Sequence, residues 1–360
     1  MRIAINTGGG DAPGLNAAIR SATLSALRRG WEVMGIMNGY GSIYTEHPFK
    51  KLTYDSVRGI TMMGGTILGS ANKANPFEVP VTKKDGSVEL EDRSDAVVEE
   101  FEKYSIDALV AIGGDGSMHI AHRLSQKGLN VVGVPKTIDN DIWGCDVSLG
   151  FDTAVTTATE AIDRIRTTAQ SHQRIMIVEV MGRYAGWIAL HSGLSASADA
   201  ILIPEIRFNV DAIAEKVMER QRKGDTYSII VAAEGAVEED GHRFVKGKEP
   251  GQSEQLGGIG EYLEDVLSEK TGKESRSLVL GHLQRGGTPS TYDRLISLRF
   301  GAAAIRALDE KDFNRMIVMQ QNSIKRIPLE DVAGKVKNVP LDSDTILTAK
   351  EIGICLGNSK

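Results

Sequence analysis

The chain has 360 residues, of which 41% are hydrophobic and 25% are charged, and this composition excludes a disordered or fibrous protein. The length predicts about two domains. With 42 Lys and Arg against 48 Asp and Glu, the net charge of −6 argues against a nucleic-acid-binding protein. The two cysteines lack the spacing of a metal site, and no apolar run is long enough to cross a membrane. We therefore expect a cytoplasmic protein with no nucleic-acid or membrane partner.

Short apolar runs alternate with amphipathic segments along the whole chain, which predicts βαβ units and a mostly parallel sheet. Strands are expected at residues 2–6, 33–37, 108–112, 131–134, 175–180, 200–203, 228–232 and 277–280. Helices are expected at residues 15–29, 118–126, 186–192, 259–269 and 292–308. Residues 75–93 and 236–258 have the composition of surface excursions, and the segment after Arg326 is too weakly patterned to assign.

Glycine is over-represented, with 39 residues or about 11% of the chain against an average near 7%. The first cluster, in the sequence TGGGDAPG at residues 7–14, lies between a predicted strand and a predicted helix. Such a turn lets backbone N–H groups approach a phosphate at the helix N-terminus. The segment matches neither the dinucleotide fingerprint GxGxxG nor a P-loop, and a tight structural turn is the alternative.

A second glycine cluster, GGDGS at residues 113–117, also follows a predicted strand and precedes a helix. Ligands bind at this edge of open parallel sheets. Asp115 adds a carboxylate for Mg²⁺ beside a backbone phosphate cradle, the combination that phosphoryl transfer needs. The alternative is that Asp115 only caps the helix.

Two carboxylates, Asp139 and Asp141, lie in the sequence PKTIDND at residues 135–141, directly after another predicted strand. One could accept a proton from a substrate hydroxyl while the other serves the surroundings of a metal. An Asx-turn loop without catalytic function would also explain the pattern.

Arginines recur at the ends of predicted strands. Arg183 follows the strand at 175–180, Arg174 precedes it, Arg276 precedes the strand at 277–280, and Arg285 follows that strand. The planar guanidinium binds phosphate through two hydrogen bonds, so this distribution in an acidic protein favours anion recognition. Each arginine by itself is more typical of a solvated or ion-paired surface residue than of a ligand contact, and only their joint position favours anion recognition.

Seven motifs occur in order along the chain: GGGDAPGLNAAIR, GGTILGS, IGGDGS, PKTIDND, SHQR, VEVMGRYAG and VLGHLQRGG. Together they resemble the 6-phosphofructokinase family, over a stretch from the first strand to about residue 320. The resemblance implies two stacked α/β domains with mostly parallel sheets. It assigns residues 1–150 and 284–334 to a domain that binds ATP and Mg²⁺, and residues 151–283 and 335–360 to a domain that binds the sugar phosphate.

The reaction implied by the resemblance is the Mg²⁺-dependent transfer of the ATP γ-phosphate to the 1-hydroxyl of fructose 6-phosphate, a step of glycolysis. Asp139 matches the general base, with Thr137 and Arg183 as further catalytic residues, and Asp115 matches the residue that engages Mg²⁺. The residues implied for donor binding are Gly9, Asn72, Lys73, Gly114, Asp115, Gly116 and Ser117. The residues implied for sugar-phosphate binding are Thr137, Ile138, Asp139, Arg174, Met181, Gly182, Arg183, Glu234, Arg276, His282, Leu283, Gln284 and Arg285.

Arg174 and Arg276 match arginines that reach in from a neighbouring subunit, so the resemblance also implies a homo-oligomer, either a dimer or a tetramer. Asn72 stands where many relatives carry an arginine that steadies the transferring phosphate. Lys73 beside it offers a less directional positive charge.

The phosphoryl donor depends on two positions. Relatives that use pyrophosphate resemble one another in having Asp where this chain has Gly116, and that carboxylate occupies the space of the ATP α-phosphate. Lys136 points the other way, because lysine there is typical of pyrophosphate users. A steric and electrostatic block outweighs one additional cation, so we expect ATP as the donor and keep pyrophosphate as the alternative.

Two other classes of protein compete with this interpretation. A nicotinamide-dependent dehydrogenase would also have glycine-rich turns, but the strict GxGxxG fingerprint is absent from the sequence. A nucleotide-sensing module would keep the cradle and lose the base, whereas Asp115, Asp139 and Asp141 are all present.

Overall fold

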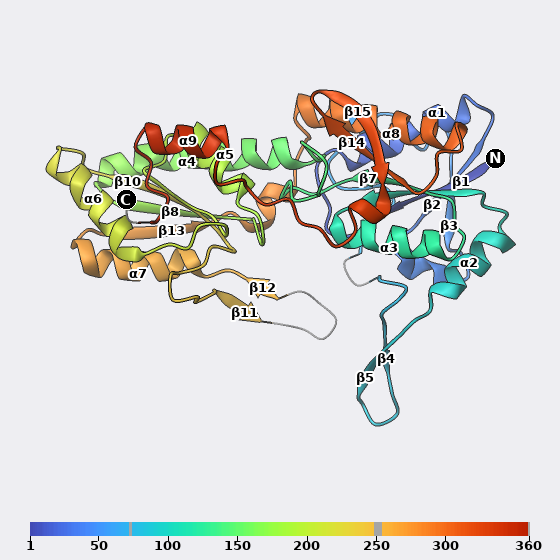
Figure 1. The fold of residues 1–360 in the computed structure, drawn as a ribbon, viewed down its shortest axis with the longest axis horizontal. Helices are drawn as coiled ribbons and strands as arrows, with labels where there is room; N and C mark the ends of the chain where they lie inside the picture. Colours follow the sequence, from blue (N-terminus) through green and yellow to red (C-terminus); the bar gives the residue numbers. More distant parts are fainter. Residues whose placement is uncertain (72–73, 248–253, 359–360) are drawn as a thin grey trace. The chain divides into compact units, whose positions relative to one another are not determined.

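The computed structural model describes residues 1–71, 74–247 and 254–358. It confirms an α/β fold with mostly parallel sheets. The chain divides into two compact units (Figure 1). Unit 1 comprises Met1–Ile138, Ile142–Asp152 and Arg285–Val336, and unit 2 comprises Asp139–Asp141, Thr153–Gln284 and Lys337–Lys360.

Unit 1 is built on a seven-stranded sheet whose central strands are parallel. In sheet order the strands are β15 (Ser323–Pro328), β14 (Arg315–Gln320), β7 (Val131–Pro135), β6 (Ala108–Gly113), β1 (Arg2–Thr7), β2 (Glu32–Ile36) and β3 (Phe49–Leu52). The two edge strands, β15 and β3, are antiparallel to their neighbours. Every residue of β6 is buried, and its sequence ALVAIG is a continuous apolar run, as expected for a parallel strand covered on both faces.

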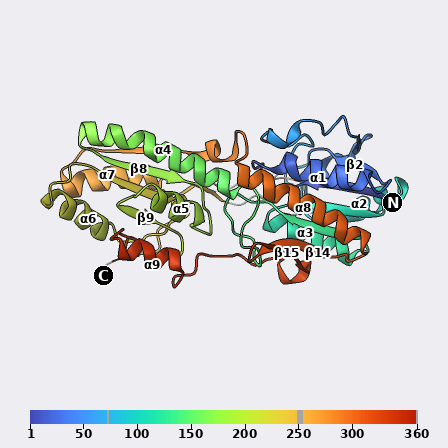
Figure 2. The ribbon, with the colours of Figure 1, turned by 90° about the horizontal axis from the view of Figure 1, so that it is seen from above.

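Helices cover both faces of this sheet. The helices α1 (Leu15–Leu27) and α8 (Thr291–Asp309) lie side by side on one face, and α2 (Ser94–Lys103) and α3 (Asp115–Gln126) lie on the other (Figures 1 and 2). The pair α1 and α8 packs closely because Gly301 has no side chain. A Cβ at Gly301 would stand 2.4 Å from the carbonyl oxygen of Ala18.

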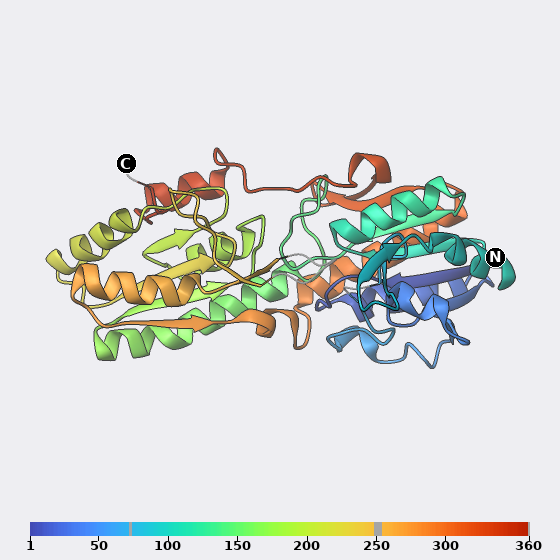
Figure 3. The ribbon, with the colours of Figure 1, turned by 90° about the horizontal axis from the view of Figure 1, so that it is seen from below.

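Unit 2 contains a four-stranded parallel sheet in the order β13 (Ser275–Val279), β8 (Ile175–Val180), β10 (Ser228–Ala233) and β9 (Ala200–Leu202). Its helices are α4 (Phe151–His172), which starts in unit 1, α5 (Trp187–Ser195), α6 (Val210–Arg222), α7 (Ile259–Thr271) and α9 (Asp344–Glu351). The helices α6 and α7 pack against each other, and α7 runs along β13 and β8 (Figure 3). Their apolar faces form one core with β8, β9 and β10.

The predicted βαβ units are present, with ends shifted by up to three residues, and several elements were missed. The missed helices are α2, α4, α6 and α9, and the missed strands include the hairpin of β14 and β15. The expected excursion at 75–93 contains the hairpin of β4 (Val79–Thr82) and β5 (Val88–Glu91). Within the residues that the structure describes, the excursion at 236–258 contributes the antiparallel pair β11 (Val245–Gly247) and β12 (Gln255–Leu256).

Two differences bear on function. The helix predicted from residue 118 already begins at Asp115, so Gly116 and Ser117 belong to its first turn. The strand predicted at 277–280 is Ser275–Val279, because Arg276 pairs with Met176 in the sheet. Across the described ranges, none of the helices combines the length and the apolarity needed to cross a membrane.

Candidate active site

In unit 1 the first two glycine-rich loops meet at the carboxyl edge of the sheet. The connection from β1 leads to β2 on one side and the connection from β6 leads to β7 on the other, so the loops diverge at a switch point of the sheet. The N–H of Gly8 donates to the carbonyl oxygen of Ile112 at 2.9 Å. A Cβ at Gly8 or at Gly113 would stand within 2.5 Å of the Ser117 Oγ. The glycines therefore let two backbone turns and the start of α3 converge.

Lys136 brings the third predicted loop to the same place. Its N–H donates to the carbonyl oxygen of Gly113 at 2.9 Å, and its ammonium donates to the carbonyl oxygen of Gly10. The residue is only 3% exposed, so its positive charge is held inside the loop cluster rather than in solvent. Anionic groups are favoured beside such a charge and beside the N-terminus of α3.

The first turn of α3 carries the residues expected to meet the donor. Asp115 is half-buried, and its Oδ1 accepts a hydrogen bond from the N–H of Gly334 at 3.2 Å. Gly116 is exposed, and a Cβ there would have no atom within 4 Å. The described residues contain no cluster of three or more metal-ligating side chains. A single carboxylate beside a phosphate cradle fits Mg²⁺, which is held through one or two carboxylates together with substrate phosphates.

The loop at 64–70 is fastened to the same cluster by residues that the sequence did not single out. Asn16 is buried, donates to the carbonyl oxygens of Met63 and Gly64 at 3.2 and 3.1 Å, and accepts from the N–H of Ile67 at 2.8 Å. A Cβ at Gly64 would stand 2.2 Å from the carbonyl oxygen of Gly287. Asn16 lies in the quoted motif GGGDAPGLNAAIR, but only the folded loop shows its role.

Asn72 and Lys73, expected at the donor, lie outside the described residues. Ser70 before them donates a hydrogen bond from its Oγ to the carbonyl oxygen of Gly9. Arg285, expected at the sugar phosphate, belongs to unit 1 and donates from Nη1 to the carbonyl oxygen of Asp11 at 3.1 Å. The structure thus brings five of the predicted segments together on unit 1.

The segment with the expected base turns sharply. Thr137 and Ile138 belong to unit 1, and the carbonyl oxygen of Thr137 accepts from the Ser148 Oγ at 2.8 Å. Asp139 is half-buried and is grouped with unit 2. Asn140 follows it in the left-handed region with φ 54°, a conformation that asparagine tolerates better than most residues. The backbone therefore turns between the two carboxylates of the DND sequence.

In unit 2 the loops after β8, β10 and β13 converge at the carboxyl edge of the second sheet. The N–H of Glu234 donates to the carbonyl oxygen of Val180 at 2.8 Å, and the N–H of Gly235 donates to that of Gly182 at 3.1 Å. Buried Gln284 accepts from the N–H of Met181 at 3.4 Å. These hydrogen bonds link the segments that carry Met181, Gly182, Glu234 and Gln284, four of the residues expected at the sugar phosphate.

Gly235 makes this convergence possible, although only its place next to Glu234 distinguished it in the sequence. A Cβ at Gly235 would stand 2.0 Å from the carbonyl oxygen of Arg183 and 2.8 Å from that of Gly182. The Nη1 atom of Arg183 is buried and makes no hydrogen bond within the described part of the chain. Burying a guanidinium N–H without an acceptor costs free energy, and a bound anion would supply that acceptor.

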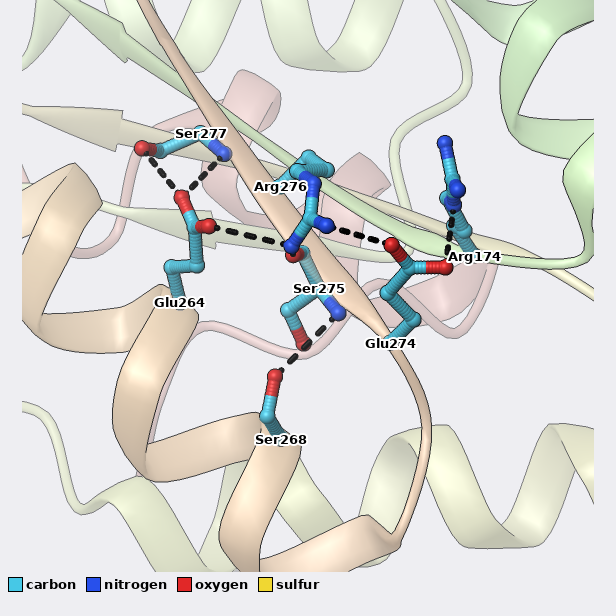
Figure 4. Close-up of polar contacts among 7 residues, drawn as sticks. All are labelled: Arg174, Glu264, Ser268, Glu274, Ser275, Arg276 and Ser277. Carbon is cyan, nitrogen blue, oxygen red and sulfur yellow. Dashed lines mark hydrogen bonds and ion pairs between the residues drawn. The ribbon is translucent and has the colours of Figure 1, made fainter.

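Arg174 and Arg276 lie at the opposite edge of the same sheet. Arg174 precedes β8 and Arg276 is the second residue of β13, whereas Met181 and His282 follow the carboxyl ends of these strands. Six residues at about 3.3 Å each separate the two edges by roughly 20 Å. Both arginines bind Glu274, and the hydrogen bond from Arg174 is the largest cause that holds the pKa of this carboxyl below its usual range (Figure 4).

Comparisons with known proteins agree with this arrangement. The family profile described as Phosphofructokinase matches residues 2–308. Relatives named ATP-dependent 6-phosphofructokinase are 42–49% identical over nearly the full chain, and the one from Clostridium perfringens is 49% identical, covering 98% of this chain and 97% of its own. A relative from Amycolatopsis methanolica, named pyrophosphate--fructose 6-phosphate 1-phosphotransferase, is 47% identical over 94% of this chain and 96% of its own.

The fold matches solved structures as well. The crystal structure of Pichia pastoris phosphofructokinase in the T-state superposes with a TM-score of 0.78 and 31% identity over 92% of this chain. This chain spans 37% of the length of that protein.

Proposed function

The chain belongs to the phosphofructokinase family, and from that premise we propose the residues through which it transfers the γ-phosphate of ATP to the 1-hydroxyl of fructose 6-phosphate, giving fructose 1,6-bisphosphate. The observation that carries the assignment is the convergence of the glycine loops of unit 1 around Lys136 and the first turn of α3. Backbone N–H groups, a helix N-terminus and a buried cation together form a site for a chain of phosphates.

Unit 1 is then the domain that binds the donor, through Gly9, Gly114, Gly116 and Ser117. Asp115 would hold Mg²⁺, which would offset the negative charge of the donor phosphates. The protein's own contribution is to keep Asp115 at the start of α3, beside the glycine backbone, through the hydrogen bond from Gly334. Asn72 and Lys73 belong to this proposal by position in the sequence alone.

Unit 2 is the domain that binds the sugar phosphate. In this proposal the Asp139 carboxylate accepts the proton of the 1-hydroxyl as that oxygen bonds to the γ-phosphorus and ADP leaves with the electrons of the broken P–O bond. Thr137 orients the reacting hydroxyl, and Arg183 offsets the negative charge of the transferring group. Met181, Gly182 and Glu234 contact the sugar, with Ile138, His282, Leu283, Gln284 and Arg285 completing the substrate site.

In this proposal Arg174 and Arg276 bind the sugar phosphate in the site of a second copy of the chain. Their position at the amino edge of the sheet, roughly 20 Å from the loops of their own sugar site, supports it, because an arginine side chain does not reach that far. The functional protein is accordingly a homo-oligomer, a dimer or a tetramer, whose sites are shared between copies. We also propose a cytoplasmic location, a reducing compartment in which the thiols of Cys145 and Cys355 would stay reduced.

Pyrophosphate is the second candidate donor, and Lys136 is the observation that favours it. The open space at Gly116 supports ATP, since no side chain fills the position expected at the α-phosphate. An initial-rate comparison of the purified protein with MgATP and with Mg-pyrophosphate, each with fructose 6-phosphate, tests the assignment. We expect kcat/KM to be higher with ATP, and strong activity with pyrophosphate alone would overturn it.

A further inference from the structure

Glu274 links the two arginines at the amino edge of the unit 2 sheet. Its carboxylate accepts from the Arg174 Nε at 2.6 Å and from the Arg276 Nη2 at 2.5 Å (Figure 4). The backbone brings the three residues together, because the N–H of Ile175 donates to the carbonyl oxygen of Glu274 at 3.0 Å. Arg174 and Glu274 are therefore cross-strand neighbours at the starts of β8 and β13.

The surroundings of Arg276 are fixed from the other side by α7. β13 is an edge strand, and the N–H groups of Ser275 and Ser277 donate to side chains of this helix, Ser268 Oγ at 3.2 Å and Glu264 Oε2 at 2.8 Å. Arg276 Nη1 donates to the carbonyl oxygen of Ser275 at 2.9 Å and approaches the second oxygen of Glu264 at 3.4 Å. The guanidinium of Arg276 thus lies between two carboxylates.

Arg174 is held by one atom only. Its Nε is bound to Glu274, and its two terminal nitrogens make no hydrogen bond within residues 1–71, 74–247 and 254–358. The side chain is 27% exposed, so these donors are accessible while the stem is packed. Because the carboxylate occupies the Nε side of the guanidinium, two parallel N–H donors remain for a phosphate.

We propose that Glu274 is a positioning residue that holds Arg174 and Arg276 together as one receptor for the 6-phosphate of the sugar bound in a neighbouring copy. The proposal rests on the proposed function of the two arginines. A free arginine loses much rotamer freedom when it binds a ligand, so side chains fixed beforehand bind more tightly. A carboxylate between two guanidinium groups also offsets the repulsion between them before the phosphate arrives.

The test is steady-state kinetics of the Glu274→Gln variant in the full-length protein. Glutamine keeps the length of the side chain and one acceptor oxygen, but it removes the charge. We expect the KM for fructose 6-phosphate to rise about tenfold, as for the loss of a charge-assisted hydrogen bond, while kcat and the KM for ATP stay within twofold. The Glu274→Asp variant, which keeps the carboxylate, should recover part of the loss.

A matched control is Glu269→Gln, which removes an exposed carboxylate of α7 that makes no hydrogen bond or ion pair with either arginine within the described residues. It should leave every kinetic constant unchanged, and both variants should melt within a few degrees of the parent protein. An unchanged KM for fructose 6-phosphate in Glu274→Gln would overturn the inference. A lower KM would overturn it as well, because it would mean that the Glu274 carboxylate competes with the phosphate for the arginines.

The single variants Arg174→Ala and Arg276→Ala separate this inference from the proposed function. If neither raises the KM for fructose 6-phosphate, the assignment of the arginines is wrong. If both raise it and Glu274→Gln does not, only the positioning role is wrong. In the Arg174→Ala background, Glu274→Gln should raise the KM for fructose 6-phosphate by less than it does in the parent protein, because only Arg276 is left for the carboxylate to hold. Full additivity would indicate a general structural effect and overturn the inference.

Discussion

Replacing Gly116 with Asp tests the donor site at a position where the fold accepts a side chain. A Cβ at Gly116 meets no atom within 4 Å, and the residue lies exposed in the first turn of α3. A carboxylate there interacts favourably with the helix dipole, by about 0.3–1 kcal/mol, so we expect the variant to fold. Its effect should be confined to the ligand that binds beside this turn.

The expected magnitude follows from the charge that the substitution introduces. Two unit charges about 4 Å apart near a protein surface repel by about 4 kcal/mol at an effective dielectric constant near 20. Because Gly116 is exposed, solvent and salt screen part of this repulsion, and we take about 2–3 kcal/mol for a carboxylate beside the α-phosphate of ATP. This corresponds to a kcat/KM for ATP lower by about 30-fold to 150-fold. Pyrophosphate has no nucleoside and no third phosphate, so it escapes most of the repulsion.

The assay is the initial rate with each donor at saturating fructose 6-phosphate, for Gly116→Asp and for its neutral counterpart Gly116→Asn. The asparagine variant adds nearly the same volume without the charge, so it measures the steric part alone. A folded aspartate variant whose kcat/KM for ATP falls less than threefold would refute the placement of the α-phosphate beside Gly116. Equal losses in both variants would refute the electrostatic argument.

The remaining predictions concern the base, the sugar loops and pH. Asp139→Ser should lower kcat by about 10²-fold to 10⁴-fold and leave the calorimetric affinity for fructose 6-phosphate unchanged, and a kcat within threefold of the parent would contradict the base assignment. In Gly235→Ala the Cβ would stand 2.0 Å from the Arg183 carbonyl oxygen, so urea denaturation should show a loss of about 1–3 kcal/mol and the KM for the sugar should rise; an unchanged midpoint would count against this contact. Burial first, and Lys337 second, hold the pKa of His191 below its usual 6.5, so the folded protein loses stability as pH falls through that range. The melting temperature of His191→Gln should therefore fall less between pH 7.5 and 5 than that of the parent, and parallel curves would disprove the argument.

Local patterns predicted the elements whose signal lies within a few residues. β6 was recognisable as a strand because ALVAIG is a continuous apolar run ended by glycines, and its boundaries differ from the prediction by one residue. The helix α4 was missed although it has 22 residues. Its many threonines and alanines give a weak apolar contrast, and its helical form depends on packing along its length.

The same contrast applies to the candidate site. The glycine turns at residues 8–10 and 113–116 could be placed at strand ends because glycine clusters and apolar runs are adjacent in the sequence. Asn16 and Gly235 could not be singled out, since the first acts on a loop about fifty residues away and the second on the backbone of Arg183. The residues next to Asn16 and Gly235 in the sequence do not indicate which distant segment each one contacts.

By itself the sequence determined the class of fold, the glycine-rich strand ends and, through seven ordered motifs, the family. These properties depend on residue types at short spacing, which set backbone freedom and hydrophobic period. The tertiary structure alone decided that Lys136 lies within the glycine-rich loops of unit 1 and that Glu274 joins Arg174 to Arg276. Strand order and register decide which distant residues become neighbours, and they result from the packing of whole sheets and helices rather than from any local segment.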